Sequence, residues 1–126
     1  GVEAVEAKLK ADGVRFTRLS VATAFHSPVV SSSEAPYAAF LAGIKFASAK
    51  LPVWSGETTK PYAKTAKAKT ARLARQISNP VRFVGLIKDM ADSGIHTFIE
   101  VGPGAVLTSL IGKTLKGTDH AAIALD

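Results

Sequence analysis

Cysteine is absent from the 126 residues of this chain. This absence excludes a disulfide framework and a thiolate metal site, and it is compatible with a reducing compartment such as the cytoplasm. No apolar run approaches the roughly 18 residues of a membrane-spanning helix, and no signal segment opens the chain. The only methionine is Met90, so we expect that Gly1 is not an initiation residue and that upstream sequence exists. The sequence thus predicts a cytoplasmic protein without membrane contact.

Patterns for metal binding and for nucleophilic catalysis are also missing. The histidines His26, His96 and His120 lie far apart and show no paired ligand spacing. No serine lies in a Gly-x-Ser-x-Gly elbow, the turn that exposes a nucleophile in α/β-hydrolases. We therefore expect no metal, no permanently bound cofactor and no nucleophile from this chain.

What the chain does have is a sizeable apolar content and a local excess of positive charge. The hydrophobic fraction of 47% argues against disorder, and the length fits one domain with a buried core. The net charge is +6, and the stretch from Lys60 to Lys88 carries basic residues but no acidic one. Such a stretch indicates either an anionic partner or a solvated helix face. Nucleic acid is not expected, because only Tyr62 and Phe83 offer rings for stacking within it.

Hydrophobic periodicity and turn residues predict alternating helices and strands. The predicted helices cover residues 2–11, a segment after a Ser31–Glu34 capping box, 63–77, a segment beginning at Asn79-Pro80, and a segment after Gly104. The predicted strands cover residues 14–21, 51–54, 95–101 and 121–125. Strands that alternate with helices favour an α/β fold in which helices flank a parallel sheet.

His26 is the first candidate for chemistry. It follows the predicted strand 14–21, and open α/β sheets place their sites at the carboxyl ends of strands. Imidazole can accept and release a proton near neutral pH, although many histidines are only structural. A base without a nucleophile is half of a catalytic dyad. The position therefore points to a general base whose partner lies elsewhere.

Two other functions remain open from the residues alone. The turn Gly102-Pro103-Gly104 between a strand and a helix invites a nucleotide-binding interpretation. Leu107 stands where the dinucleotide fingerprint needs a small residue, and Pro103 lacks an N–H for a phosphate, so a structural turn is favoured. Alternatively, the segment from Lys60 to Arg75 could make the chain a basic adaptor for an acidic protein.

Three motifs together resemble a known enzyme family. They are Ala24-Phe25-His26-Ser27-Pro28, then Arg75-Gln76-Ile77-Ser78-Asn79-Pro80-Val81-Arg82-Phe83, then Phe98-Ile99-Glu100-Val101-Gly102-Pro103-Gly104-Ala105-Val106-Leu107. In this order they resemble the carboxyl-terminal half of malonyl-CoA:acyl carrier protein transacylases and of the acyltransferase domains of polyketide and polyunsaturated fatty acid synthases. The resemblance implies a partial α/β-hydrolase-like acyltransferase fold. Residues 1–21 would be the last helix and strand of a ferredoxin-like small subdomain, and residues 22–126 would belong to the large subdomain.

The resemblance also implies a reaction. A serine takes malonyl from its coenzyme A thioester and passes it to the phosphopantetheine thiol of an acyl carrier protein. His26 matches the histidine that activates the serine, and Gln76 matches the residue whose backbone carbonyl orients that histidine. The segment Thr23-Ala24-Phe25-His26 is similar to the malonyl-type specificity motif, although Thr23 departs from it.

The family's serine elbow and its carboxylate-binding arginine have no match in this chain. The resemblance therefore implies that the isolated chain is inactive. The partners expected are malonyl-CoA, the carrier protein, the amino-terminal half of the same domain, and a second copy of the chain through its uncovered apolar surface.

Overall fold

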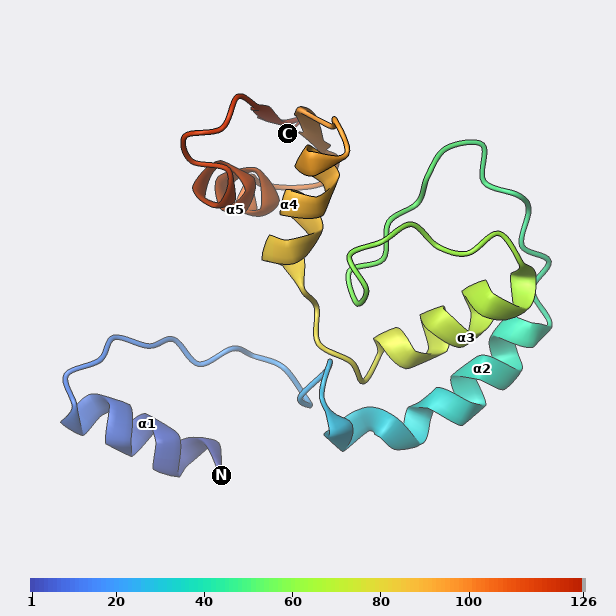
Figure 1. The fold of residues 1–126 in the computed structure, drawn as a ribbon. Helices are drawn as coiled ribbons and strands as arrows, with labels where there is room; N and C mark the ends of the chain where they lie inside the picture. The colour runs from blue at the N-terminus through green and yellow to red at the C-terminus, as the bar shows by residue number, and fades with distance from the viewer. Residues whose placement is uncertain (126) are drawn as a thin grey trace.

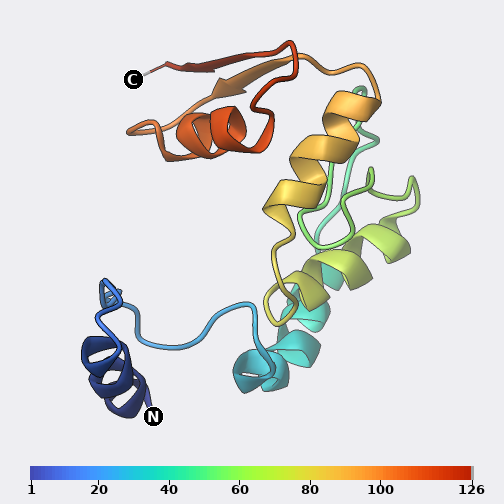
Figure 2. The same ribbon diagram turned by 60° about the vertical axis from the view of Figure 1, so that its left-hand side comes forward.

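The computed structural model describes residues 1–125 as a set of short helices with one small sheet (Figure 1). In chain order the elements are α1 (Val2–Ala11), the 3₁₀ helix η1 (Pro28–Ser33), α2 (Glu34–Ala42), α3 (Ala66–Gln76), α4 (Phe83–Asp92), β1 (Thr97–Glu100), α5 (Val106–Thr114) and β2 (Ala121–Ala124). Figures 1 and 2 show α1 apart from the other elements, at the end of a long extended connection. None of the helices described is long and apolar enough to span a membrane.

The carboxyl-terminal part contains the sheet and the largest apolar cluster. Strands β1 and β2 pair in parallel, with Thr97 opposite Ala121 and Glu100 opposite Ala124, and α5 connects them. Parallel neighbours need such a crossover, which explains the strand–helix–strand order. The buried side chains of this part form one cluster made of Ile87, Ala91, Phe98, Ile111 and Leu115. Helices α4 and α5 thus cover one face of the two-stranded sheet.

Ile87 should be a main source of stability for this cluster. Its side chain is 4% exposed, so Ile87→Ala removes buried methyl groups and leaves a cavity. We expect the free energy of unfolding to fall by about 2–5 kcal/mol, as for other large-to-small core substitutions. Val84 lies on the same helix but is 56% exposed, and Val84→Ala is the matched control. Urea unfolding followed by circular dichroism measures both, and equal losses in the two variants would contradict this packing.

The middle of the chain is a helical pair that carries residues beside His26. Helices α2 and α3 pack against each other, with Leu41 of α2 and Ala74 of α3 buried. Both views show the two helices side by side (Figures 1 and 2). Helix η1 leads into α2, and Ser27 caps it because its Oγ accepts the N–H of Val29 at 3.3 Å. The carboxyl end of α3 thereby comes to lie beside the turn that contains His26.

Two predicted strands are wrong. Residues 14–21 form no strand, and residues 51–54 form only an isolated bridge between Trp54 and Pro61. A strand is defined by hydrogen bonds to a neighbour, and side chains such as Leu19 and Leu51 are exposed with nothing packed over them. The β-branched and apolar residues of 14–21 and the apolar residues of 51–54 form a strand only where a neighbouring strand is present.

The predicted helix starts were also partly wrong. Helix α4 begins at Phe83 rather than at Asn79-Pro80, because the Asn79 side chain donates to Glu57 Oε1 at 2.9 Å instead of capping a helix. The backbone N–H of Arg82 donates to the carbonyl of Gly56 at 2.7 Å. Similarly, the Ser31–Glu34 capping box does not form, because these serines lie within η1 and Ser33 makes no capping bond.

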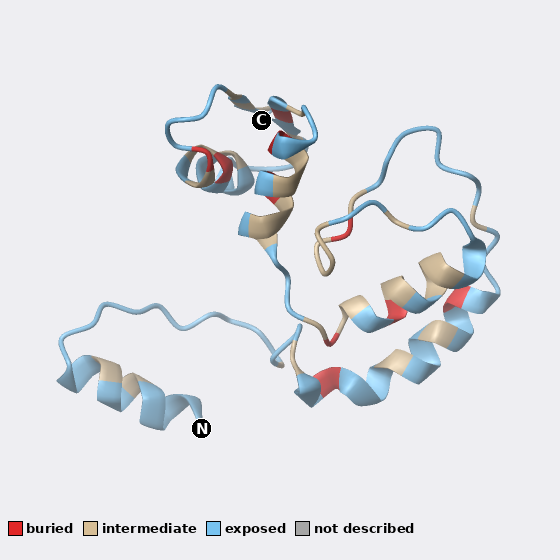
Figure 3. Cartoon of the chain, in the orientation of Figure 1, coloured by how far each residue is buried: buried red, intermediate tan, exposed pale blue. Residues whose placement is uncertain are grey.

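Several apolar residues in and just before α4 and α5 are exposed. The exposed members are Val81, Val84, Val106, Leu107 and Leu110, whereas Ile87, Ile111 and Leu115 are buried. In Figure 3 the buried residues of α4 and α5 lie where these two helices meet each other and the sheet. A sheet of two strands is too narrow to cover the remaining faces of these helices. The chain therefore presents an extended apolar surface to its surroundings.

Candidate active site

His26 adopts an uncommon backbone conformation at the end of the extended connection. Its φ angle is +58°, in the left-handed region, which costs a residue other than glycine about 1–3 kcal/mol. The N–H of His26 donates to the carbonyl of Ile77 at 2.8 Å and so fixes this backbone to the linker after α3. A strained residue held in this way is typical of functional sites.

The imidazole of His26 is oriented by two backbone carbonyls. Its Nδ1 lies 2.8 Å from the oxygen of Gln76 and 3.2 Å from the oxygen of Asn79. A carbonyl oxygen only accepts, so Nδ1 carries a hydrogen, and in the neutral imidazole Nε2 then carries the lone pair. The side chain is exposed, and Nε2 makes no hydrogen bond to any residue in the range 1–125. The arrangement leaves a basic nitrogen available to an incoming group.

The position of Gln76 explains why its carbonyl is available. Gln76 is the last residue of α3, and the final carbonyls of a helix have no partner within the helix. Its side chain is held as well, because the Tyr62 hydroxyl donates to Gln76 Oε1 at 2.7 Å. Buried Ser78 donates to the Arg75 carbonyl at 3.1 Å and to the Glu34 carboxylate, which fixes the linker that follows.

Thr23 and Phe25 lie in the same turn as His26. Thr23 is half-buried and the ring of Phe25 is 56% exposed. A groove of about 750 Å³ exists in the chain, but it is lined by residues of 46–53, 61–64 and α3, not by Thr23 or Phe25. The exposed ring of Phe25 is therefore not part of this groove.

The Gly102-Pro103-Gly104 turn does not present a free phosphate site. The Glu100 carboxylate already accepts the N–H of Leu107 at 3.0 Å, and the N–H and hydroxyl of Thr108 at 2.7 Å each. These are the groups at the start of α5 that would bind a phosphate. The hydrogen bonds from the N–H and the hydroxyl of Thr108 hold the pKa of Glu100 below its usual value. Burial opposes them, and the N–H of Leu107 adds a weaker lowering effect. The structure therefore gives no support to the nucleotide-binding alternative.

Glu100 should make the stability of the chain depend on pH. Because its pKa is lowered by folding, Glu100 contributes stability above its ordinary value of 4.5 and loses it as the pH falls through the lower folded-state value. In Glu100→Gln the carboxylate is absent, so the stability difference from the wild type should be largest at neutral pH and shrink in acid. Urea unfolding over this pH range measures it. Glu3→Gln on exposed α1 is the control, and a pH-independent difference for Glu100→Gln would contradict the assignment.

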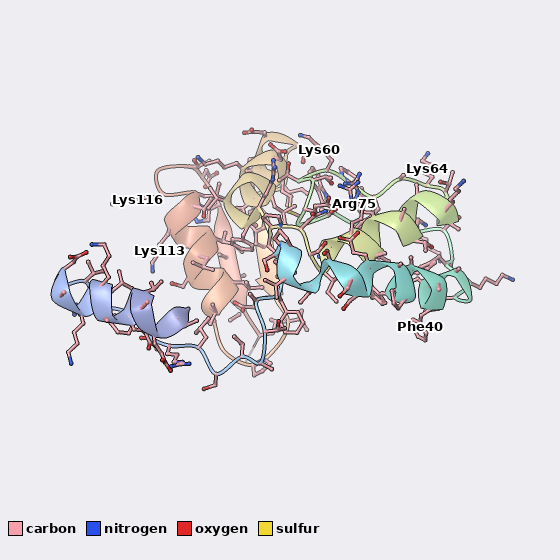
Figure 4. The ribbon with its side chains drawn as sticks, turned by 90° about the horizontal axis from the view of Figure 1, so that it is seen from below. Phe40, Lys60, Lys64, Arg75, Lys113 and Lys116 are labelled. Atoms are coloured by element: carbon pink, nitrogen blue, oxygen red, sulfur yellow. The ribbon has the colours of Figure 1, made fainter. Side chains whose placement is uncertain are left out.

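Much of the basic segment is engaged within the chain. Arg72 and Arg75 lie 3.4 and 3.9 Å from the Glu57 carboxylate, and Lys60 lies 2.7 Å from Asp89. The hydrogen bonds from Lys60 and from Thr59 lower the pKa of Asp89. Figure 4 shows Lys60 and Arg75 on the same side of the molecule, with Lys64 farther along. Internal pairing of this kind gives no support to the basic adaptor alternative.

The other histidines are not part of the site. His96 is exposed just before β1, and Nδ1 of His120 lies 2.8 Å from the Thr118 carbonyl. No group of three metal-ligating side chains comes together within the described range 1–125.

Comparison with known proteins gives consistent matches. The family model described as an acyl transferase domain matches residues 1–125. The chain is 35% identical over 108 residues to the polyketide biosynthesis malonyl CoA-acyl carrier protein transacylase BaeC of Bacillus velezensis, covering 86% of the chain and 37% of BaeC. The chain thus spans little more than a third of the length of this relative.

Solved structures show the same fold. An acyl-carrier-protein S-malonyltransferase from Burkholderia pseudomallei superposes with a TM-score of 0.85 and 28% identity, covering 99% of the chain and 40% of that protein. The complex PlMCAT:AntF, a type II polyketide synthase acyl carrier protein with its malonyl-transacylase, gives a TM-score of 0.81 and 27% identity, covering 98% of the chain and 38% of that protein. The described fold is therefore that of part of a malonyl transacylase.

Proposed function

Because the chain belongs to the acyl transferase domain family, we propose that it supplies the general base of an acyl transfer from malonyl-CoA to an acyl carrier protein. The observation that carries the proposal is the pair of carbonyls, at 2.8 and 3.2 Å, that hold Nδ1 of His26 and leave Nε2 free. The nucleophile would be a serine in a part of the domain outside residues 1–126.

The proposed chemistry has two steps. In the first, Nε2 of His26 takes the proton of the serine hydroxyl as the oxygen attacks the thioester carbonyl. The carbon–sulfur bond breaks, and the proton passes to the departing coenzyme A thiolate. In the second, Nε2 takes the proton of the phosphopantetheine thiol as the sulfur attacks the serine ester. The carbon–oxygen bond breaks, and the proton passes from Nε2 to the departing serine oxygen. General acid–base catalysis of this kind contributes about 10²–10⁴-fold to the rate.

The carbonyls of Gln76 and Asn79 would act during both steps. They hold the imidazole in the tautomer that has a basic Nε2, the role that a carboxylate plays in a serine hydrolase triad. When His26 becomes an imidazolium, their partial negative charges lie close to its N–H and stabilise it. No bound cofactor is required, because the coenzyme A thioester and phosphopantetheine are substrates.

We also propose that malonyl is the acyl group. Phe25 directly precedes His26, and its exposed ring would line the acyl pocket once the rest of the domain supplies the opposite wall. A bulky ring there would crowd a branched acyl group and leave room for malonyl. Thr23 lies half-buried in the same turn and would contribute to the shape of that pocket. The absence of cysteine agrees with a cytoplasmic location for the reaction.

The exposed apolar surface supports a further polypeptide partner. The exposed side chains of this surface include Val84, Ile99, Leu107, Leu110 and Ile123. Many exposed large apolar side chains on one part of a chain are typical of a surface that another polypeptide covers. The amino-terminal half of the same domain is the proposed partner, since the chain spans only 37–40% of the relatives that share its fold. Residues 1–21 would then join the small subdomain and residues 22–126 the large one. A second copy of the chain would compete for the surface when that half is absent.

The proposal can be tested on a polypeptide that extends this chain to the length of its relatives. Radiolabelled malonyl-CoA and a purified acyl carrier protein should give labelled carrier protein, and a dinucleotide should neither bind nor alter the transfer. Dinucleotide binding without malonyl transfer would contradict the proposed function and would favour the alternative based on the Gly102 turn.

A further inference from the structure

The carboxylate of Glu57 lies at the junction of three segments around His26. Its side chain is 11% exposed, although it belongs to the loop between α2 and α3. Oε1 accepts the Asn79 side-chain amide at 2.9 Å, and the carboxylate also faces the guanidinium groups of Arg72 and Arg75 at 3.4 and 3.9 Å. A carboxylate so deep in the fold needs such partners, because an unpaired buried charge is costly.

The loop that carries Glu57 is itself fixed. Buried Ser55 accepts the N–H groups of Glu57 and Thr58 through its Oγ at 3.3 and 3.4 Å. The backbone carbonyl of Gly56 accepts the N–H of Arg82 at 2.7 Å. Glu57 is therefore anchored at its own backbone before its side chain reaches across to Asn79.

Asn79 connects Glu57 with the candidate base. Its side chain donates to Glu57, and its own backbone carbonyl is the second acceptor, at 3.2 Å, for Nδ1 of His26. The Gln76 carbonyl, the first acceptor, lies only three residues earlier in the chain. The hydrogen bond to Glu57 therefore also restricts the backbone carbonyl of Asn79, which contacts the imidazole of His26.

We propose that Glu57 is a positioning residue for His26, acting through Asn79 to fix the orientation and the tautomer of the imidazole. The expected effect on malonyl transfer rests on the proposed function, whereas the expected effect on the tautomer of His26 does not. The two arginines pair with the carboxylate and hold it in place, and the hydrogen bond that the Asn79 side chain donates to Oε1 links this position to the site. Residues that orient metal-bound histidines, an analogous arrangement, typically change activity by about 10–100-fold when they are removed.

The alternative role is purely structural. In that role Glu57 would only neutralise Arg72 and Arg75, and the bond to Asn79 would be incidental. The two roles separate in Glu57→Gln, which keeps an oxygen acceptor for Asn79 but loses the negative charge. Glu57→Ala loses both. Asn79→Ala removes the donor while leaving the pairing of Glu57 with the arginines intact. This variant replaces Glu57→Ala in the test if Glu57→Ala does not fold.

The matched control is Glu6→Gln. Glu6 is also a partly buried carboxylate paired with an arginine, Arg18 at 3.4 Å, but it lies on α1, away from His26. The primary measurement is the tautomer of His26, read from the ¹⁵N chemical shifts of Nδ1 and Nε2 in the 126-residue chain at a pH where imidazole is neutral. A second measurement, in the extended polypeptide, is the rate of malonyl transfer and the KM for malonyl-CoA.

We expect the wild type, Glu57→Gln and Glu6→Gln to show Nδ1 protonated. Glu57→Ala and Asn79→Ala should show a mixture of the two tautomers. In the extended polypeptide these two variants should lower the transfer rate about tenfold with little change in KM, the low end of the range for such partners.

An unchanged tautomer in folded Glu57→Ala or Asn79→Ala would overturn the proposal. Equal disturbance by Glu57→Gln and Glu57→Ala would also overturn it, because charge pairing alone would then explain the effect. If the tautomers change as expected but the extended wild-type polypeptide transfers no malonyl, the proposed function fails and the positioning role stands.

Discussion

Replacing His26 with alanine should slow malonyl transfer about 10²–10⁴-fold in a polypeptide that extends this chain to the length of its relatives. The imidazole is the group that the geometry leaves ready to take a proton, because its Nδ1 is held by Gln76 and Asn79 and its Nε2 is free. The alanine variant keeps the backbone but has no base. The serine ester should therefore form slowly, and its transfer to the carrier thiol should be slow as well.

The measurement is single-turnover formation of the labelled acyl-enzyme, followed by its transfer to carrier protein. His96→Ala is the control, because His96 is exposed beside β1 and makes no contact with the site. Circular dichroism should show that both variants keep the helical content of the wild type. A His26→Ala protein that reacts within a few-fold of the wild type would remove His26 from the catalytic role.

The second large effect concerns the chain without any added polypeptide. The 126 residues contain no serine in an elbow motif, and a base alone has nothing to activate. We therefore expect no acyl-enzyme when the chain alone is mixed with malonyl-CoA. Adding a separately produced amino-terminal half should cover the surface that includes Ile99, Leu107 and Ile123, and acyl transfer should then appear.

Intact mass spectrometry detects the acyl-enzyme, and sedimentation detects the association. A double charge substitution, Leu107→Asp with Ile123→Asp, should prevent both, because it places a charge on α5 and a charge on β2 where apolar side chains would otherwise be covered. Both side chains are exposed in the chain alone, so the introduced carboxylates stay hydrated there and lose their hydration only when the amino-terminal half binds. Transfer activity in the chain alone, or full recovery of activity with the charged variant, would contradict this part of the proposal.

The elements that sequence reasoning located well are those with strong local signals. Helix α5 and strands β1 and β2 were predicted because glycine turns bound short runs of clear periodicity. Helix α3 was placed correctly from its helix-forming residues, although its packing against α2 was not evident from its many charges. These signals act over a few residues and need no information about distant parts of the chain.

The missed elements depend on contacts between distant residues. The stretch 14–21 has the composition of a strand but lacks a neighbour, and sequence alone does not say whether one is present. Asn79 looked like a helix cap, but the side chain of Glu57, 22 residues earlier, takes its amide instead. Local propensity was overruled in both cases by the presence or absence of a tertiary partner.

Some residues of the candidate site were also identified from local motifs, whereas others were missed because they depend on distant contacts. His26 and Gln76 were identified through motifs, and the structure brings them to 2.8 Å although 50 residues separate them. The Asn79 carbonyl and the Glu57 carboxylate were not identified, because backbone carbonyls carry no sequence signal and Glu57 lies in a polar loop. An acidic residue just before a run of basic ones was the only available indication of their pairing.

The most direct test of the account is to locate the acyl group. The extended polypeptide is incubated briefly with malonyl-CoA, quenched in acid, digested and mapped by peptide mass spectrometry. We predict a malonyl ester on a serine outside residues 1–126, with a yield that falls about 10²-fold or more at the same time point in His26→Ala. An ester on any residue within 1–126 would contradict the claim that this chain contributes the base and not the nucleophile.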